Sequence, residues 1–443
     1  MKNIIRKHVK TAALCTLAVS TVLSSSTGVL AKGVKPSSSS YRTVTEVEDW
    51  GAVITKVIVD LGKPVPKGAV TTDTFNVHVV RSDSRLTNPK LEEGDRTVIN
   101  AYVSDKDGNR VVQTGKYAVL EIEIGPDVTL GSALNFAYPP GFNAWSDNQY
   151  TITQQKEIKT PAGSITGLVA DTFAGGVREL IDDFTTGQAT YNGQTLTYAD
   201  FAPKKDNHKN PLIIWLHGFG EGGTDPTMPI AANKAVNFAS EHIQSYFDGV
   251  YVLAPQTPTF WMDGVTGFGD GTSKYEDSLM ALIQDYAANN KDIDPNRIYI
   301  GGDSNGGYMT MLMIRDYPDY FAAAFPTCEA LKDTLVTEED IRNMKELPIW
   351  FVAAKTDNVV PPDQYAVPTF NRLALAGAKD VHMSLFDKVI DTSGLYKKAD
   401  GTPYEYGGHN SWIYVYNNEV KDTINGKETT LMEWLASQSL SKR

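Results

Sequence analysis

The residue with the clearest chemical potential is Ser304, at the centre of a Gly-x-Ser-x-Gly pentad that runs from Gly302 to Gly306. The pentad follows the short apolar run 298–300 and precedes the apolar run 308–314, so a sharp turn between a strand and a helix is expected there. Such a turn presents the serine hydroxyl as a nucleophile, and flanking glycines avoid the collisions that side chains would make. A bare pentad also arises by chance in small-residue turns, but this context makes Ser304 a candidate nucleophile.

A serine nucleophile needs a base, and the base needs an acid that orients it. His409 lies in a glycine-rich loop before the final helical region and is the candidate base. The other histidine that follows Ser304, His382, sits in an alternating strand pattern and is interpreted as a packed or surface residue. Asp357 comes one short loop after the apolar strand 349–354 and is the candidate acid. Three such residues on three separate loops after strands indicate acyl-transfer chemistry.

The transition state of acyl transfer also needs hydrogen-bond donors for a developing oxyanion. The backbone N–H of Asn305, directly after the nucleophile and at a helix N-terminus, is the first predicted donor. The second is the N–H of Phe219, next to Gly218 in the glycine-rich turn 216–223. This turn lacks the lysine and the spacing of a phosphate-binding loop. His217 is expected to support the turn rather than to act as the base.

Near-continuous apolar runs separated by helical stretches must position these residues. The runs are 211–216, 250–254, 297–300, 320–325 and 348–354, and a helix is predicted at 277–286. Apolar strands that are buried on both faces and alternate with helices indicate a doubly wound, mostly parallel α/β sheet. In such sheets ligands bind beyond the carboxyl ends of the strands, where all of the candidate residues fall.

The preceding part of the chain has a different pattern. Alternating runs at 75–80, 97–103 and 117–124, with an Asp107-Gly108 turn between two of them, predict a small all-β sandwich over residues 44–158. Asp105 and Asp107 are explained by turn chemistry rather than by calcium binding. A serine-rich spacer (32–43) is expected before the sandwich. A connector (159–183), with one helix near 177–183, is expected between it and a catalytic domain over 184–440. The sandwich could bind polysaccharide, guard the mouth of the site or act only as a spacer.

The N-terminal segment has the pattern of a secretory signal peptide, residues 1–31. Four basic residues precede an apolar run at 11–23, and small residues follow at 29–31. Cys15 lies inside the apolar run after the bulky Leu14, so no lipid anchor is expected on it. No later segment has the ~18 unbroken apolar residues of a membrane span. We therefore expect an exported, extracellular protein without such a span.

Charge and cysteine content narrow the set of partners. Loss of the four positive charges of residues 1–31 would take the formal net charge from −12 to about −16, which argues against nucleic acids and anionic membranes. Cys328 then stands alone in an apolar stretch, so no intramolecular disulfide is expected and the thiol is interpreted as a packed core group. No His/Cys/Asp cluster has metal-ligand spacing, and neither a metal nor an organic cofactor is expected. The sequence does not indicate an oligomeric state.

Several stretches together carry a family resemblance. They are Trp215-Leu-His-Gly-Phe-Gly-Glu-Gly-Gly223, Ala254-Pro-Gln256, Asp294-Pro-Asn-Arg-Ile-Tyr-Ile-Gly-Gly-Asp-Ser-Asn-Gly-Gly307, Asp357 with Val360-Pro361, and Gly408-His-Asn-Ser-Trp412. Residues ~184–440, which hold them, resemble the α/β-hydrolase superfamily. Within it the chain is similar to secreted esterases, often labelled predicted peptidases, that are related to polyhydroxybutyrate depolymerases and feruloyl esterases. Some of those relatives carry an N-terminal immunoglobulin-like domain, in agreement with the predicted sandwich.

The resemblance implies a secreted serine carboxylester hydrolase that works through an acyl-enzyme. Its substrate would be a small ester or a polymer-linked one, for example an ester of a plant cell-wall polysaccharide. Two alternatives stay open: a serine peptidase of the prolyl-oligopeptidase type, and a surface-binding protein without catalytic activity.

Two departures from the relatives concern the substrate pocket. Many relatives have methionine after the nucleophile, where this chain has Asn305 with a polar side chain at the expected pocket floor. The long loop 388–408 before His409 holds Tyr396, Tyr404 and Tyr406, which could shape an aromatic acyl pocket or simply pack the loop, and the loop could act as a lid. Trp261, Tyr404 and Trp412 are predicted to line the pocket.

Overall fold

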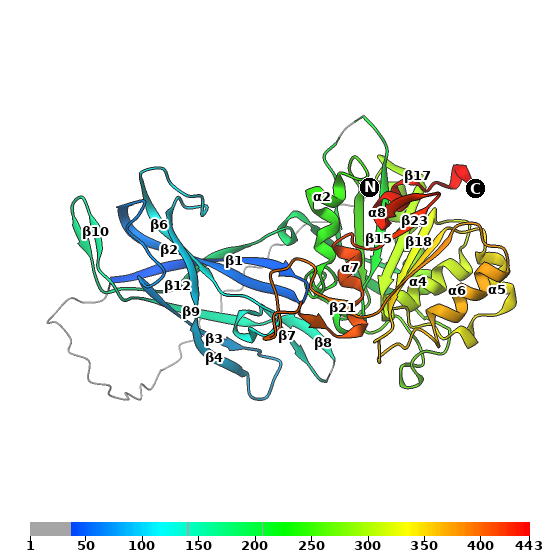
Figure 1. Ribbon diagram of the computed structural model, residues 1–443, viewed down its shortest axis with the longest axis horizontal. Coiled ribbons are helices and arrows are strands. Elements are labelled where there is room, and N and C mark those ends of the chain that lie inside the picture. Colours follow the sequence, from blue (N-terminus) through cyan, green and yellow to red (C-terminus); the bar gives the residue numbers. More distant parts are fainter. Residues whose placement is uncertain (1–36, 140, 206) are drawn as a thin grey trace, which may run out of the picture. The chain divides into compact units, whose positions relative to one another are not determined.

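The computed structural model describes residues 37–139, 141–205 and 207–443. The predicted signal peptide (1–31), Cys15 and the first part of the predicted spacer lie outside the described residues. Two eight-stranded sheets contain most of the strands in the described part of the chain (Figure 1). No helix in that part is both long enough and apolar enough to cross a membrane.

The C-terminal sheet has the strand order β13-β14-β16-β15-β17-β18-β19-β20. Its strands are β13 (Thr185–Tyr191), β14 (Gln194–Phe201), β15 (Asn210–Leu216), β16 (Tyr251–Gln256), β17 (Ile293–Asp303), β18 (Ala323–Thr327), β19 (Ile349–Ala354) and β20 (Val381–Phe386). The strands β13, β14 and β16 pair antiparallel, and all pairs from β16 onward are parallel. The sheet is therefore mostly parallel, as predicted, with an antiparallel edge.

Both faces of this sheet are covered, because the side chains of its strands alternate between two hydrophobic cores. In β15, Ile213 and Trp215 belong to one core, whereas Leu212, Ile214 and Leu216 belong to the other. Helices α3 to α6 pack into the second core, and α1, α2, α7 and α8 into the first (Figure 1). The helices are α1 (Met228–Ala231), α2 (Glu241–Gln244), α3 (Glu276–Asn289), α4 (Asn305–Asp316), α5 (Glu338–Met344), α6 (Ala366–Leu375), α7 (Trp412–Tyr416) and α8 (Leu431–Ser437). The doubly wound α/β architecture is confirmed.

The N-terminal sheet has the order β4-β3-β9-β12-β1-β2-β6-β5. Its strands are β1 (Ser37–Glu48), β2 (Gly51–Pro66), β3 (Phe75–Ser82), β4 (Lys90–Arg96), β5 (Val98–Ser104), β6 (Thr114–Ile122), β9 (Asp147–Gln154) and β12 (Leu168–Arg178). The three alternating runs fall in β3, β5 and β6, and Gly108 has φ +87° in the turn that joins the antiparallel pair β5 and β6. The all-β architecture of the N-terminal part is thus confirmed, and these eight strands form a single sheet.

Short antiparallel pairs complete the fold. They are β7 (Leu134–Ala137) with β8 (Phe142–Trp145), β10 (Ile158–Thr160) with β11 (Gly163–Ile165), β21 (Val389–Ile390) with β22 (Glu405–Tyr406), and β23 (Lys421–Ile424) with β24 (Lys427–Thr430).

The structure differs from the sequence expectation at both ends of the N-terminal sheet. Residues 37–43 of the expected spacer are strand, because β1 has a parallel partner in β12 on one side and an antiparallel partner in β2 on the other. The expected connector contains β12, which belongs to the same sheet. In place of the helix near 177–183, Val177 and Arg178 end β12 and residues 181–183 form one 3-10 turn. In the second sheet, β18 begins at Ala323 rather than at residue 320.

Candidate active site

The turn around Ser304 joins β17 to α4, as predicted. Ser304 has φ +55° and ψ −112°, a backbone conformation that residues other than glycine rarely adopt. Its N–H donates to the carbonyl oxygen of Thr327 at 3.0 Å. A Cβ atom on Gly306 would lie 1.9 Å from the carbonyl oxygen of Leu216, so only glycine fits the close approach of the helix to β15. The backbone therefore holds the serine hydroxyl at a strained, fixed position at the end of the central strand.

The three residues predicted to act together lie in one hydrogen-bonded row. His409 Nε2 is 2.9 Å from Ser304 Oγ, and His409 Nδ1 is 2.7 Å from Asp357 Oδ2. The Asp357 side chain is fully buried, and its Oδ1 accepts the N–H groups of Val359 at 2.9 Å and Val360 at 2.8 Å. The carboxylate is thus fixed by the loop after β19, and it can in turn fix the tautomer of the imidazole, with Nδ1 protonated and Nε2 free to accept from the serine.

Two backbone N–H groups near Ser304 are the candidate donors to the oxyanion. Asn305 is the first residue of α4, and Phe219 is the first residue of a 3-10 helix, Phe219–Glu221, that follows β15. Within the described residues no acceptor is recorded for the N–H of either residue. Both N–H groups are orphan donors of helical first turns, and the dipole of α4 adds positive potential beside Ser304.

His217 supports the Phe219 turn from below. It is 1% exposed, and its Nδ1 contacts the carbonyl oxygen of Gly218 at 2.7 Å while its Nε2 accepts the N–H of Thr257 at 3.2 Å. Burial lowers the pKa of His217 to about 4, so the ring is neutral at pH 7. Both ring nitrogens are used by the backbone, which leaves His217 the supporting role that was predicted.

Behind the same turn lies a pair of buried carboxyl groups that the sequence reasoning missed. A Cβ atom on Gly218 would lie 2.7 Å from Asp303 Oδ2 and 2.9 Å from Glu221 Oε2, so the two side chains converge on one point of the backbone. Burial raises the pKa of Glu221 to about 7, and burial together with the charge of Glu221 raises the pKa of Asp303 well above its usual range. Two such groups cannot both ionise cheaply, so the pair retains a proton at neutral pH.

The N-terminal domain reaches this turn through the β7–β8 hairpin. Asn143 in β8 donates through Nδ2 to the carbonyl oxygen of Gly220 at 3.2 Å and to Glu221 Oε1 at 3.3 Å. Phe260 stacks on the ring of Phe219 with centroids 3.8 Å apart. No signal in the sequence points to Asn143, because it lies 77 residues before the backbone group that it binds.

A cavity of about 370 Å³ opens beside Ser304 and His409. It is lined by Gly218, Phe219, Gly220, Glu221, Asn233, Met262, Phe268, Asp303, Ser304, Asn305, Val359, His409 and Trp412. Of the three predicted pocket residues, only Trp412 is in this lining. The apolar wall is instead made by Met262, Phe268 and Val359, which carried no recognisable motif.

The structure places Trp261 and Tyr404 elsewhere. Trp261 is fully buried against His217 and Tyr275, with ring centroids 5.1 and 6.2 Å away, so its ring belongs to the core beneath the pocket. The backbone N–H of Trp261 donates to Asn305 Oδ1 at 2.7 Å. The polar side chain after the nucleophile therefore anchors the loop that carries Met262. Tyr404 donates its hydroxyl to Asp127 of the N-terminal domain at 2.9 Å.

The loop 388–408 packs against the N-terminal domain. Besides the Tyr404 contact, the ring of Tyr396 lies edge-on to Trp50 with centroids 4.8 Å apart. Tyr406 is 8% exposed in β22, which pairs with β21. Of the two roles left open for its tyrosines, the structure places these three in packing and interdomain contacts.

The residues for which the sequence predicted no catalytic or metal-binding role take part in packing and hydrogen bonding. His382 in β20 contacts Asp380 through Nε2 at 2.8 Å and packs beside Trp350. Cys328 is buried, and burial raises the pKa of its thiol. Asp105 accepts the N–H groups of Asp107 and Asn109 within its turn. Among the described residues no group of three or more His, Cys, Asp or Glu side chains could hold a metal ion.

Comparison with known proteins adds independent information. The profile described as the Esterase Ig-like N-terminal domain matches residues 40–167, and that of the Prolyl oligopeptidase family matches residues 268–340, which include Ser304. Feruloyl esterase B of Neurospora crassa is 31% identical over 130 residues, 28% of this chain and 40% of that protein. Poly(3-hydroxybutyrate) depolymerase of Ralstonia pickettii is 29% identical over 126 residues, 27% of this chain and 25% of that protein. The chain thus spans less than half the length of these curated relatives.

A solved structure described as a thermostable esterase matches across both domains. It superimposes with a TM-score of 0.73 and 27% identity, covering 90% of this chain and 99% of that one. The comparisons support an ester-hydrolysing enzyme.

Proposed function

We propose that this chain, an α/β-hydrolase with an immunoglobulin-like N-terminal domain, is a serine carboxylester hydrolase in which Ser304 is the nucleophile, His409 the base and Asp357 the orienting acid. The observation that carries the proposal is the unbroken row of contacts from the buried Asp357 through both ring nitrogens of His409 to the Ser304 hydroxyl. His217 differs, because both of its ring nitrogens contact backbone groups and so support the turn. The two contacts of His409 are to side chains and have no comparable structural role.

The geometry supports a two-step acyl transfer. Ser304 Oγ attacks the ester carbonyl carbon while His409 Nε2 takes the hydroxyl proton, and Asp357 stabilises the imidazolium that forms. The negative charge on the former carbonyl oxygen is received by the N–H groups of Phe219 and Asn305. The tetrahedral intermediate collapses, the C–O bond to the alcohol breaks, and His409 returns the proton to the leaving alcohol. Water then attacks the acyl-enzyme, gives a proton to His409 Nε2, and releases the acid as Ser304 regains its proton.

We propose a small acyl group for the substrate. A cavity of about 370 Å³ is near the lower end of the range of roughly 300–1,000 Å³ for ligand pockets. Met262, Phe268, Val359 and Trp412 give it an apolar wall. The alcohol side can be a small molecule or a polymer such as a plant cell-wall polysaccharide, and the relatives include a feruloyl esterase and a depolymerase of a polyester. The signal-peptide pattern of residues 1–31 supports secretion as part of this proposal.

A serine peptidase is the second candidate, because the Prolyl oligopeptidase family profile covers the nucleophile. An ester has a better leaving group than an amide, so a site built for amides hydrolyses both, whereas an esterase hydrolyses the ester far faster. A p-nitrophenyl ester and a p-nitroanilide with the same acyl group separate the two. At the highest enzyme concentration that the assay allows, we expect hydrolysis of the ester and no hydrolysis of the anilide. Comparable kcat/KM for the two substrates would favour the peptidase.

The triad is tested by Ser304→Ala and His409→Ala, each measured on a short p-nitrophenyl ester. We expect kcat/KM to fall at least about 10⁴-fold for each variant, with a double variant no worse than either single one, because the residues act as a unit. His382→Gln is the matched control, since His382 is also hydrogen-bonded to an aspartate but lies in β20. Retained turnover in Ser304→Ala, or an equal loss in His382→Gln, would refute the triad.

A further inference from the structure

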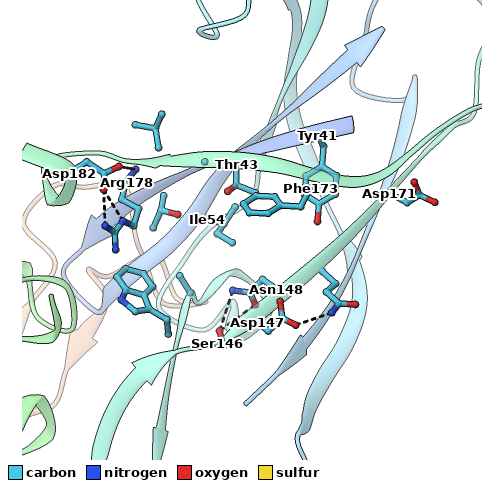
Figure 2. A pocket seen from close by; sticks show the side chains of 16 residues that line it. Tyr41, Thr43, Ile54, Ser146, Asp147, Asn148, Asp171, Phe173, Arg178 and Asp182 are labelled. Atoms are coloured by element: carbon cyan, nitrogen blue, oxygen red, sulfur yellow. Dashed lines mark hydrogen bonds and ion pairs between the residues drawn. The ribbon is translucent and has the colours of Figure 1, made fainter. Parts of the chain in front are cut away.

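A second cavity, of about 690 Å³, lies wholly in the N-terminal domain (Figure 2). It opens where the sheet comes apart. Strands β9 and β12 pair only through two residue pairs, Val169 with Thr153 and Ala170 with Ile152. Beyond these pairs the strands diverge, and the cavity opens between residues 146–149 and residues 171–178.

The floor of the cavity is built from inward-facing side chains of β1 and β2. Tyr41, Thr43, Thr45 and Ile54 are all buried there. The hydroxyl of Tyr41 accepts the N–H of Tyr150 in β9 at 3.0 Å, which replaces the missing strand partner at that point. On the other side, the N–H of Arg178 donates to Asp182 Oδ2 at 2.8 Å. Side chains thus satisfy one backbone donor on each side of the gap.

One wall of the cavity is aromatic and exposed. Phe173 in β12 is 58% exposed and lies against Tyr41 with ring centroids 5.6 Å apart, as Figure 2 shows. Val177 on the same strand is 43% exposed, and Trp145 also lines the cavity. A large aromatic side chain presented to water beside a cavity is typical of a binding surface.

The lining also carries carboxylate and amide groups. Asp147, Asn148 and Gln149 lie on the β9 side and Asp171 on the β12 side, and three of these four are exposed. Carboxylates accept, and amides both donate and accept, so this set suits a ligand rich in hydroxyl groups.

The charge of the lining excludes other ligands. The cation in the lining is Arg178. Its Nε–H donates to Asp182 Oδ1 at 2.9 Å, so Asp182 neutralises its charge. Asp147 and Asp171 remain, so the cavity carries net negative charge and disfavours phosphate, carboxylate or polyuronate ligands. A fatty acyl chain would leave the carboxylates and amides desolvated without partners.

We propose that this cavity is a carbohydrate-binding site that holds a segment of neutral polysaccharide. The apolar C–H face of a sugar ring would stack on Phe173, and its hydroxyls would hydrogen-bond to Asp147, Gln149 and Asp171. Trp145 lines the cavity, and its Nε1–H donates to the hydroxyl of Thr227 in the catalytic domain at 2.9 Å. The bound chain would therefore be held by a domain that is fastened to the hydrolase, which suits an ester carried on a polymer. The binding itself does not depend on the proposed ester hydrolysis.

The test is affinity gel electrophoresis of the Ser304→Ala protein, which binds without turnover. The gels contain xylan, mixed-linkage β-glucan, glucomannan or amylose, with polygalacturonate as an anionic comparison. We expect retardation by at least one neutral polysaccharide and none by polygalacturonate. Phe173→Ala should weaken that binding at least tenfold. The matched control is Ile99→Ala in β5 of the same sheet, because Ile99 is 59% exposed and so closely equals Phe173 in exposure.

Three results would overturn the proposal: no retardation by any of the four neutral polysaccharides, retardation only by polygalacturonate, or equal retardation of the Ser304→Ala protein with and without Phe173→Ala. Binding is measured with both surface substitutions in the Ser304→Ala background. In the wild-type background both are expected to leave turnover of a small p-nitrophenyl ester unchanged. Failure of carbohydrate binding is thereby distinguished from failure of the catalytic proposal.

Discussion

Replacement of Glu221 by glutamine should make the protein more stable at alkaline pH. Glu221 lies behind the oxyanion turn beside Asp303, and burial raises its pKa from 4.5 to about 7. Glutamine has the shape of the protonated acid, can still accept from Asn143, and can donate to Asp303. The substitution Glu221→Gln therefore removes only the titration.

The sign follows from proton binding. Between pH 4.5 and about 7 the folded protein retains a proton on Glu221 that the unfolded chain releases, so the free energy of unfolding falls as the pH rises through this window. The full shift corresponds to roughly 3 kcal/mol, most of which is lost between pH 5 and pH 8.5. The charge of Glu221 also raises the pKa of Asp303, so its removal acts in the same direction.

Denaturant unfolding followed by tryptophan fluorescence at pH 5 and pH 8.5 measures the effect. We expect Glu221→Gln to be within about 1 kcal/mol of the wild type at pH 5 and roughly 2–3 kcal/mol more stable at pH 8.5. Glu157→Gln, the same change at an exposed position, should leave the difference near zero at both values. If Glu221→Gln shifted stability equally at the two pH values, the buried carboxyl pair would not retain a proton and the reasoning would fail.

Three further predictions concern the active site. Asp357→Asn should lower kcat for a p-nitrophenyl ester by about 10⁴-fold, because the asparagine no longer fixes the His409 tautomer; a loss below tenfold would contradict this. Gly306→Ala puts a methyl group 1.9 Å from a strand carbonyl and should abolish soluble expression, whereas Gly267→Ala, which meets nothing within 4 Å, should keep the wild-type Tm. Asn143→Ala removes the donor to the oxyanion turn, and kcat/KM should fall by roughly tenfold, the equivalent of about 1–2 kcal/mol; unchanged kinetics would show that the turn holds itself.

What could be predicted from the sequence was set by local geometry. The strand-to-helix turn at Ser304 was recognisable because a Cβ atom on Gly302 or Gly306 would lie 2.6 or 1.9 Å from the carbonyl oxygen of Leu216, so glycine is required two residues before and two residues after the serine. The sheet was recognisable because β15, β16 and β19 are buried along their whole length and nearly all of their residues are apolar. In both cases the constraint acts on neighbouring residues and leaves its mark on their types.

The pocket could not be predicted in the same way, because loop residues have no period that fixes which side chain faces the substrate. After β16 the chain presents Met262 to the cavity and turns the adjacent Trp261 into the core, and nothing in the residue types distinguishes these two outcomes. Tyr404 is hydrogen-bonded to Asp127, which lies 277 residues away in the chain. Such pairings are properties of the assembled fold, so an aromatic residue near a catalytic histidine in sequence is weak evidence for a place in the pocket.

The contacts between the domains decide how the role of the N-terminal domain must be tested. Removing the predicted sandwich, residues 44–158, would leave β12 without β9 and β1 without β2, and it would cut through a hydrophobic core that extends from Val57 and Val77 to Trp215. It would also take away Asn143 and leave the Glu221 carboxyl without a donor from that domain. A truncated protein would therefore lose stability, the support of the oxyanion turn and the proposed carbohydrate site at once. Single substitutions separate these effects: Asn143→Ala acts on turnover of every ester, whereas Phe173→Ala should act only on esters that are carried by a polysaccharide.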